Sequence, residues 1–252
     1  MKKSKMEKPI PIPEIIARCD EFFNAGKNAE AGEFLRSWRQ KAHDSGDASA
    51  ELSIVNELIG HYRMNGDAVR GLEAVASAEK LLGSTGAAET VNGGTILLNC
   101  ATALHAFGKI EAAMEKFQSA YRCYAKNLPP DDLHFAGLLN NMSAVYADSG
   151  DFAAAKVCYL EAGEILLKEK KMMDHTLTLV NIAQLYLSFE PDSPEISAAL
   201  DQAMKCFDDR SIARDGYYAH TCTKCAGVFG AAGRESDQKE LLNRAKEIYE
   251  RA

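Results

Sequence analysis

The sequence predicts an all-α protein in which about six helix-turn-helix repeats stack into one solenoid. Three observations support this prediction. Glycine-centred turns recur along the chain, and a small residue recurs at a nearly constant spacing. Apolar residues follow the 3.6-residue period of helices, and no segment shows the strict alternation of a strand.

Five glycine-centred turns separate the two predicted helices of a repeat. They read Ala25-Gly26-Lys27, Asn65-Gly66-Asp67, Phe107-Gly108-Lys109, Ser149-Gly150-Asp151 and Ala232-Gly233-Arg234. Glycine suits this place because the left-handed conformation that closes many helices costs it little. Large residues stand four positions before these glycines and again nine positions after them. The first set is Phe22, Tyr62, Leu104, Tyr146 and Phe229, and the second is Leu35, Val75, Phe117, Tyr159 and Leu242.

The residue twelve positions after each turn glycine shows the length of the repeat. A sixth repeat lacks the glycine but aligns through Leu179, Ile182, Ala183 and Tyr186. In its turn, Ser193 is predicted to cap a helix that begins at Pro194. The residues at the period position are Trp38, Ala78, Ala120, Ala162, Ala203 and Ala245, at steps of 40, 42, 42, 41 and 42. The predicted repeats are 12–48, 49–90, 91–131, 132–172, 173–214 and 215–252.

The fourth repeat shows why such hairpins must stack. Its first helix carries one amphipathic stripe, and its second helix carries a facing stripe of smaller residues. The first stripe is Leu139, Met142, Ser143 and Tyr146, and the second is Ala155, Tyr159 and Ala162. A single hairpin cannot cover both stripes, so neighbouring hairpins are expected to share one continuous core.

The same residues carry a family resemblance. The pattern Leu139-x-x-Met142-Ser143-x-x-Tyr146, Gly150, Ala155-x-x-x-Tyr159-x-x-Ala162 resembles the tetratricopeptide repeat (TPR). The period near 42 exceeds the usual length of about 34, and the proline that usually closes each unit is missing. The long period and the segment 138–146 look most like the kinesin light chain branch. The resemblance covers 12–252 and implies a right-handed superhelix whose first helices line a concave, protein-binding groove.

The charge and composition of the chain limit the classes of binding partner. The net charge is −7, which argues against nucleic acid because phosphate binding needs clustered positive charge. The basic residues Lys2, Lys3, Lys5 and Lys8 lie in a proline-containing segment, 1–11, that is predicted to be a flexible tail. No signal peptide or apolar run of membrane-spanning length is present, so no membrane contact is expected. Seven scattered cysteines indicate free thiols and a cytoplasmic protein, with Cys100, Cys222 and Cys225 predicted to be buried.

An asparagine ladder supplies the candidate binding residues. Asn99, Asn141 and Asn181 stand nine residues before successive turns, and Asn56 and Asn140 lie one residue earlier in their repeats. Asparagine is a mediocre residue inside a helix, so the ladder needs a reason. In the resembled family, asparagines here hold the main chain of an extended ligand. The alternative is that the amides bond neighbouring helices and only orient the stack.

Five further residues are predicted to face the same groove. They are Arg63, His105, Gln184, His220 and Lys224. This set is neutral to basic although the chain is acidic, which favours a ligand with negative charge. A clamp for a chaperone tail, as in co-chaperone members of the family, needs a lysine immediately before the groove asparagine. The corresponding places here hold Leu98, Asn140 and Val180, so this binding mode is not expected.

No catalytic or cofactor motif stands out. Cys222 and Cys225 have a metal-like spacing, but both fall on the packing stripe, so no metal is predicted. Most of the other histidines (His43, His61, His134 and His175) are expected at the surface, since none has a recognisable catalytic partner.

The sequence therefore predicts a non-catalytic adaptor that holds a peptide or protein segment in its groove. Two alternatives remain. One is a self-associating subunit, such as a homodimer, with Trp38 marking an unusual end surface. The other is an enzyme that uses the Cys222 and Cys225 region.

Overall fold

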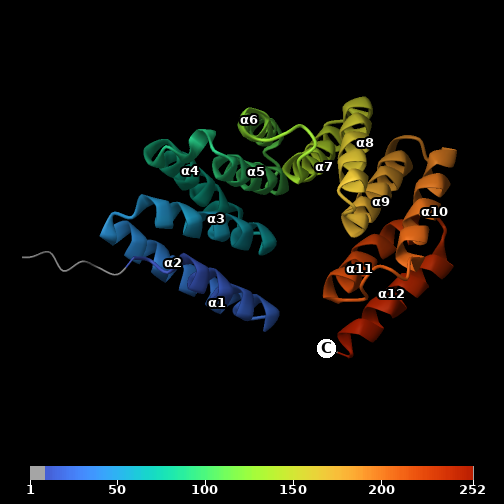
Figure 1. Cartoon of the computed structure of the whole chain (residues 1–252), viewed down its shortest axis with the longest axis horizontal. Coiled ribbons are helices and arrows are strands. Elements are labelled where there is room, and N and C mark those ends of the chain that lie inside the picture. The colour runs from blue at the N-terminus through green and yellow to red at the C-terminus, as the bar shows by residue number, and fades with distance from the viewer. Residues whose placement is uncertain (1–8, 252) are drawn as a thin grey trace, which may run out of the picture. The chain divides into compact units, whose positions relative to one another are not determined.

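The protein is described by a computed structural model over residues 9–251 (Figure 1). Within this range it is all helical, with twelve α-helices and one short 3₁₀ helix. The elements are α1 Ile12–Asn24, α2 Asn28–Ser45, α3 Ala48–Met64, α4 Ala68–Thr85, η1 Ala87–Glu89, α5 Val91–Ala106, α6 Ile110–Asn127, α7 Leu133–Asp148, α8 Phe152–Lys168, α9 Met172–Phe189, α10 Pro194–Asp208, α11 Gly216–Ala231 and α12 Glu235–Tyr249. The prediction of an all-α protein made of about six helical hairpins is confirmed.

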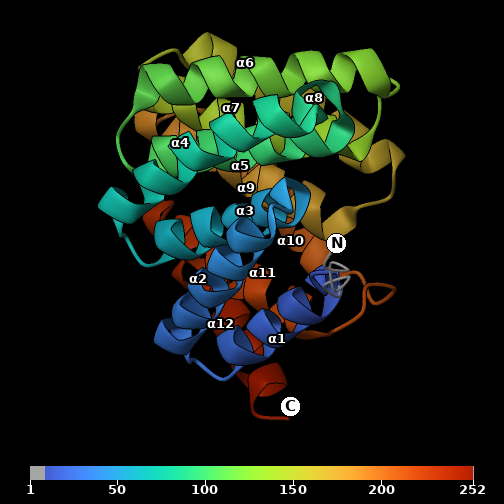
Figure 2. The ribbon, with the colours of Figure 1, turned by 90° about the vertical axis from the view of Figure 1, so that its left-hand side faces the viewer.

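The chain divides into two compact units, one ending at Pro129 and one starting at Pro130. Unit 1 contains the hairpins α1–α2, α3–α4 and α5–α6, and Figure 2 turns these helices toward the viewer. Unit 2 contains α7–α8, α9–α10 and α11–α12. One uninterrupted solenoid over 12–252 stays a prediction. Residues 1–8 of the predicted tail lie outside the described residues, and 9–11 precede α1 without helical structure.

The turns within the hairpins follow local chemistry. All five predicted turn glycines have positive φ angles, between 67° for Gly66 and 82° for Gly150. In two of these turns the residue after the glycine is an aspartate that caps the second helix. Asp67 and Asp151 accept hydrogen bonds from backbone N–H groups three residues on, at 3.1 and 3.0 Å. The turn between α9 and α10 uses Pro194 instead, which begins α10 as predicted. Ser193 stands at the N-cap position, but its hydroxyl donates to the Glu195 carboxylate and accepts no backbone N–H, so the predicted side-chain cap is not formed.

The small residues at the period position form the seam between the paired helices. Ala78, Ala120, Ala162, Ala203 and Ala245 are all at most 2% exposed. Trp38 is half-buried at the same position, where its ring packs edge-on against Phe34 and lies 3.9 Å from Lys41 Nζ. The five later hairpins therefore keep a buried alanine at this position, and the first hairpin has a half-buried tryptophan.

Three details of the predicted packing need correction. Leu242 is 44% exposed and its neighbour Leu241 is fully buried, so the predicted register of α12 was wrong there. Tyr146 is half-buried at the edge of a small cluster rather than fully buried. Most of the four remaining histidines were expected at the surface, but only His43 and His134 are exposed there, and His61 and His175 are each 8% exposed.

The burial of His61 has a specific structural reason. A Cβ atom added at Gly32 of α2 would come within 2.5 Å of the His61 Nε2 atom. Glycine at this point leaves room for the imidazole of α3 between the two helices. Burial lowers the pKa of His61, and the nearby Arg36 charge acts in the same direction.

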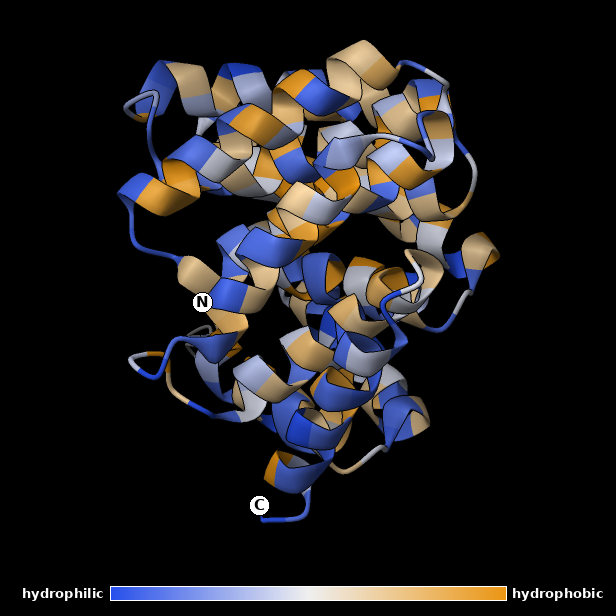
Figure 3. Cartoon of the chain, turned by 90° about the vertical axis from the view of Figure 1, so that its right-hand side faces the viewer, coloured by the Kyte–Doolittle hydropathy of each residue, from blue (hydrophilic) through white to orange (hydrophobic). Residues whose placement is uncertain are grey.

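The cysteines follow the prediction. All seven are free thiols, and Cys100, Cys222 and Cys225 are at most 1% exposed. Burial raises the pKa of Cys222 to about 11 and that of Cys225 to about 12. Figure 3 shows hydrophilic and hydrophobic residues mixed along the helices. Over residues 9–251, none of the helices has both the length and the apolarity needed to cross a bilayer.

Candidate functional site

The ten predicted groove residues all lie on the first helix of a hairpin. Four belong to unit 1, on α3 and α5, and six belong to unit 2, on α7, α9 and α11. Since each first helix packs against its own second helix, the remaining face of the first helices is available to carry these side chains. Their surroundings divide them into three groups.

The first group bonds neighbouring hairpins to each other. Asn99 Nδ2 donates to Asn56 Oδ1 at 2.9 Å, which joins α5 to α3. In unit 2, Thr178 Oγ1 donates to Asn140 Oδ1 at 3.1 Å, which joins α9 to α7. Asn56, Asn99 and Asn140 therefore make the contacts expected if the ladder only orients the stacked helices. Asn141 is also occupied locally, because its Nδ2 donates to the Gly137 carbonyl of its own helix at 2.8 Å.

The second group opens onto a cleft. Asn181 and Gln184 line a cleft of about 530 Å³ inside unit 2, between α7, α8 and α9. The full lining is Ala144, Ala147, Asp148, Tyr159, Asn181, Gln184, Leu185, Ser188 and Phe189. We call this the α7–α9 cleft. Within the described residues, the side-chain amides of Asn181 and Gln184 make no hydrogen bond to another protein group.

The α7–α9 cleft combines amide groups with an apolar wall. Tyr159 and Leu185 are 6% and 3% exposed and form its base, and Phe189 is 38% exposed at its side. Burial raises the pKa of Tyr159 to about 12, and the Asp148 charge adds to the shift. The phenol is therefore protonated at neutral pH. Such a cleft offers amide donors and acceptors beside apolar surface, which suits a peptide main chain with apolar side chains.

The third group is not brought to this cleft. Arg63, His220 and Lys224 are exposed, and none of them lines it. His105 is half-buried on α5, in unit 1. Of the ten predicted groove residues, only Asn181 and Gln184 line the α7–α9 cleft.

Most of the cleft lining was not predicted from the sequence. Leu185 and Ser188 stand four and seven residues after Asn181, the spacing of one helical face, so this signal was present in the sequence. Ala144, Ala147 and Asp148 of α7 also share one helical face, and Tyr159 lies on the predicted stripe of α8, but neither pattern shows that these faces meet α9. Their position depends on how the two hairpins pack.

A second polar cleft, in unit 1, was also missed. It measures about 350 Å³ and is lined by Arg36, Arg39, Gln40, His43 and Glu51. Glu51 is only 7% exposed. Its carboxylate accepts a hydrogen bond from Arg39 Nε at 3.4 Å and lies 3.1 Å from His43 Nδ1. Arg39 also donates to Ser77 Oγ of α4 at 2.8 Å, so this cleft is organised by contacts that join three helices.

The structure also bears on metal and thiol chemistry. Between residues 9 and 251, no three His, Cys, Asp or Glu side chains are grouped so that they would hold a metal ion. Cys222 and Cys225 are buried, whereas His220 is exposed. Burial raises the pKa of the Cys222 and Cys225 thiols, and protonated thiols are poor metal ligands and poor nucleophiles.

No family model matches this chain, and no curated protein matches it either. Solved structures do match. One is a kinesin light chain-like protein of nearly identical TPR-like repeats from Podosopora anserina, with 18% identity and a TM-score of 0.66 over 80% of this chain and 97% of that one.

Two further structures cover more of the chain. The apo form of RapI has 12% identity and a TM-score of 0.67, over 98% of this chain and 86% of that one. BtubC (BKLC) from P. vanneervenii has 19% identity and a TM-score of 0.55, over 95% of this chain and 91% of that one. At these identities the likeness is one of fold.

Proposed function

The chain has the tetratricopeptide-repeat fold, and from this premise we propose that it is a non-catalytic scaffold that binds an extended segment of a partner protein in the α7–α9 cleft. The observation that carries the proposal is the pair of amides, Asn181 and Gln184, that line the cleft without protein partners. A peptide main chain supplies the matching donors and acceptors. Leu185 and Phe189 supply apolar contact for the side chains of the segment.

The fold and the thiols support the rest of the proposal. A solenoid of helical hairpins presents an extended surface to its partners. The seven free thiols fit a reducing compartment, so we assign the protein to the cytoplasm. The net charge of −7 supports a protein partner rather than a nucleic acid.

Site-specific photo-crosslinking tests the proposed site. A photoreactive residue at Gln184 is expected to crosslink the partner, because this exposed side chain lines the cleft. Glu164 is the matched control, since it is exposed on α8 and does not line the cleft. Crosslinks from position 164 without any from position 184 would show that the partner binds elsewhere.

The crosslinked segment then gives a direct affinity measurement. Asn181→Ala should weaken its binding by about 2- to 13-fold, the effect of a hydrogen bond with a net contribution of about 0.5–1.5 kcal/mol. An unchanged dissociation constant would contradict the role of this amide.

A second candidate function is self-association, and the outer face of α8 favours it. Val157, Leu160 and Leu167 are 53%, 47% and 49% exposed and lie on one side of the helix. Exposed apolar stripes of this kind commonly mark interfaces. If α8 pairs with a second copy, Leu160→Glu should convert a dimer to a monomer in sedimentation equilibrium. A parent protein that is monomeric at all accessible concentrations would contradict this candidate.

A further inference from the structure

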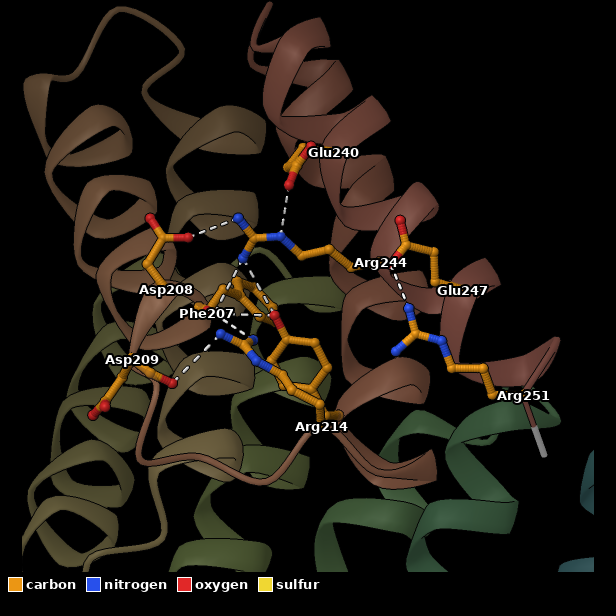
Figure 4. Close-up of polar contacts among 9 residues, drawn as sticks. Phe207, Asp208, Asp209, Arg214, Glu240, Arg244, Glu247 and Arg251 are labelled. Atoms are coloured by element: carbon orange, nitrogen blue, oxygen red, sulfur yellow. Dashed lines mark hydrogen bonds and ion pairs between the residues drawn. The ribbon is translucent and has the colours of Figure 1, made fainter.

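Unit 2 contains another cleft, away from the asparagine ladder. It measures about 230 Å³ and lies between helices α11 and α12 and the segment that joins α10 to α11. Its lining is Arg214, Tyr218, Arg244, Glu247, Ile248 and Arg251, and we call it the arginine cleft. Figure 4 labels Arg214, Arg244, Glu247 and Arg251 of this lining. None of the predicted groove residues lines it.

The carbonyl oxygen of Phe207 organises one side of the arginine cleft. Carbonyl groups in the last turn of a helix lack partners within that helix, and they form the negative end of its dipole. The Phe207 carbonyl accepts hydrogen bonds from Arg214 Nη1 at 2.5 Å, Tyr218 Oη at 3.0 Å and Arg244 Nη1 at 3.1 Å. Figure 4 shows the Arg214 and Arg244 side chains converging on Phe207. The end of α10 thus holds two guanidinium groups close together.

The two guanidinium groups differ in how their charge is compensated. Arg244 forms ion pairs with Asp208 at 2.7 Å and Glu240 at 2.9 Å. Arg214 donates only to backbone carbonyls, those of Phe207 and Asp209, and lies 4.1 Å from the centre of the Tyr218 ring.

Arg214 forms no ion pair with a described carboxylate, but it acts at longer range on Asp209, whose carboxyl pKa is lowered first by hydrogen bonds from Ser211 and further by the Arg214 charge. An arginine side chain stays charged and has five N–H donors, of which Arg214 uses two. The remaining donors can form the fork that a carboxylate or phosphate accepts in a bidentate manner.

The charges around the cleft favour a singly charged ligand. The third guanidinium, of Arg251, pairs with Glu247 at 3.3 Å, and these side chains are 76% and 64% exposed. With Asp208 and Glu240, which pair with Arg244, and Asp209, whose backbone carbonyl Arg214 binds, four carboxylates face the three arginines. A phosphate monoester carries about −1.5 to −2 at neutral pH and meets no excess positive charge here. A carboxylate needs only the fork of Arg214.

We propose that the arginine cleft binds a carboxylate attached to an aliphatic group. The carboxylate accepts two hydrogen bonds from Arg214, and the aliphatic part packs against Ile248. The end residue of a peptide and a small organic acid share this chemistry. The proposal does not depend on the α7–α9 cleft, which different residues line.

The test compares two probes of the same shape on the unchanged full chain. N-acetyl-leucine carries the carboxylate, and N-acetyl-leucinamide is its neutral counterpart. At constant ionic strength, N-acetyl-leucine should shift the Arg214 Nε–Hε resonance in a saturable manner, and the amide should bind at least about tenfold more weakly. Equal binding of both probes, or tighter binding of inorganic phosphate than of N-acetyl-leucine, would overturn the proposal.

Variants place the binding on Arg214. Arg214→Gln should weaken N-acetyl-leucine binding about tenfold, and Arg214→Lys should weaken it less because the charge remains. Arg210→Gln is the matched control, since Arg210 is exposed in the same connecting segment and does not line the cleft. Circular dichroism checks that each variant is folded. Unchanged binding in folded Arg214→Gln would overturn the assignment.

A peptide separates the two ligand sources. A hexapeptide that ends in a free leucine carboxylate should bind more tightly than N-acetyl-leucine if the cleft takes protein termini, and its C-terminal amide should bind weakly. Equal affinity of the hexapeptide and N-acetyl-leucine assigns the cleft to small organic acids. Binding of the peptide amide as tight as that of the free acid would refute the carboxylate in either case.

Discussion

Asn99 and Asn181 occupy equivalent positions in the repeats, yet the structure assigns them different roles. Asn99 bonds the Asn56 amide at 2.9 Å, whereas Asn181 lines the α7–α9 cleft without a protein partner. Replacing each by alanine therefore separates the two interpretations of the ladder. We expect Asn99→Ala to act on stability and Asn181→Ala to act on binding.

The magnitude follows from these contacts. Asn99→Ala removes one amide–amide hydrogen bond, whose net contribution is about 0.5–1.5 kcal/mol. Asn56 is half-buried, so water can reach the amide that is left behind. Alanine gains up to about 0.7 kcal/mol of helix propensity over asparagine, but this gain is shared by Asn181→Ala and cancels in the comparison. Asn99→Ala should thus be less stable than Asn181→Ala by about 0.5–1.5 kcal/mol.

Thermal unfolding and binding are measured on the same two variants. For a chain of this length the stability difference corresponds to about 1–6 °C in Tm, with Asn99→Ala melting lower. Binding of the crosslinked partner segment should weaken in Asn181→Ala and stay at the parent value in folded Asn99→Ala. If Asn181→Ala melts as low as Asn99→Ala, or if Asn99→Ala loses more affinity, the assignment of roles is wrong.

Three further predictions concern the packing. Gly137→Ala should stabilise the protein by about 0.5–1 kcal/mol because its Cβ meets open space, whereas Gly93→Ala should destabilise it by about 1–3 kcal/mol because its Cβ would lie 2.0 Å from a backbone oxygen; urea unfolding of both variants checks the opposite signs. Burial lowers the pKa of His61 and His175 in the folded state, so the unfolded chain binds more protons below about pH 6.5 and stability should fall on acidification. A double variant with glutamine at both positions should show a smaller drop in Tm between pH 7.5 and 5.5, and an unchanged drop would contradict this cause. Finally, Cys100 is fully buried and burial raises its pKa to about 12, so iodoacetamide at pH 8 should label it only after unfolding.

The sequence by itself determined the hairpins and their period. Gly66 and Gly150 mark turns because a left-handed residue must follow the first helix there, and Pro194 marks the start of α10 because its φ angle is already helical. Ala162 and its equivalents identify the seam, since only a small residue lets two helices approach so closely. Each of these features depends on the geometry of a single hairpin, and that geometry is encoded locally.

The tertiary structure decided which side chains meet between hairpins. Asn56 and Asn99 are 43 residues apart and share a hydrogen bond, although Asn181 at the equivalent place does not. His61 became buried because Gly32 of the preceding hairpin leaves room for it, and Arg214 gained its position from the carbonyl of Phe207. Such contacts depend on the crossing angle and axial offset of neighbouring helices. Helix packing admits several angles for the same apolar stripe, so the pattern that predicts a helix does not specify its neighbours' register.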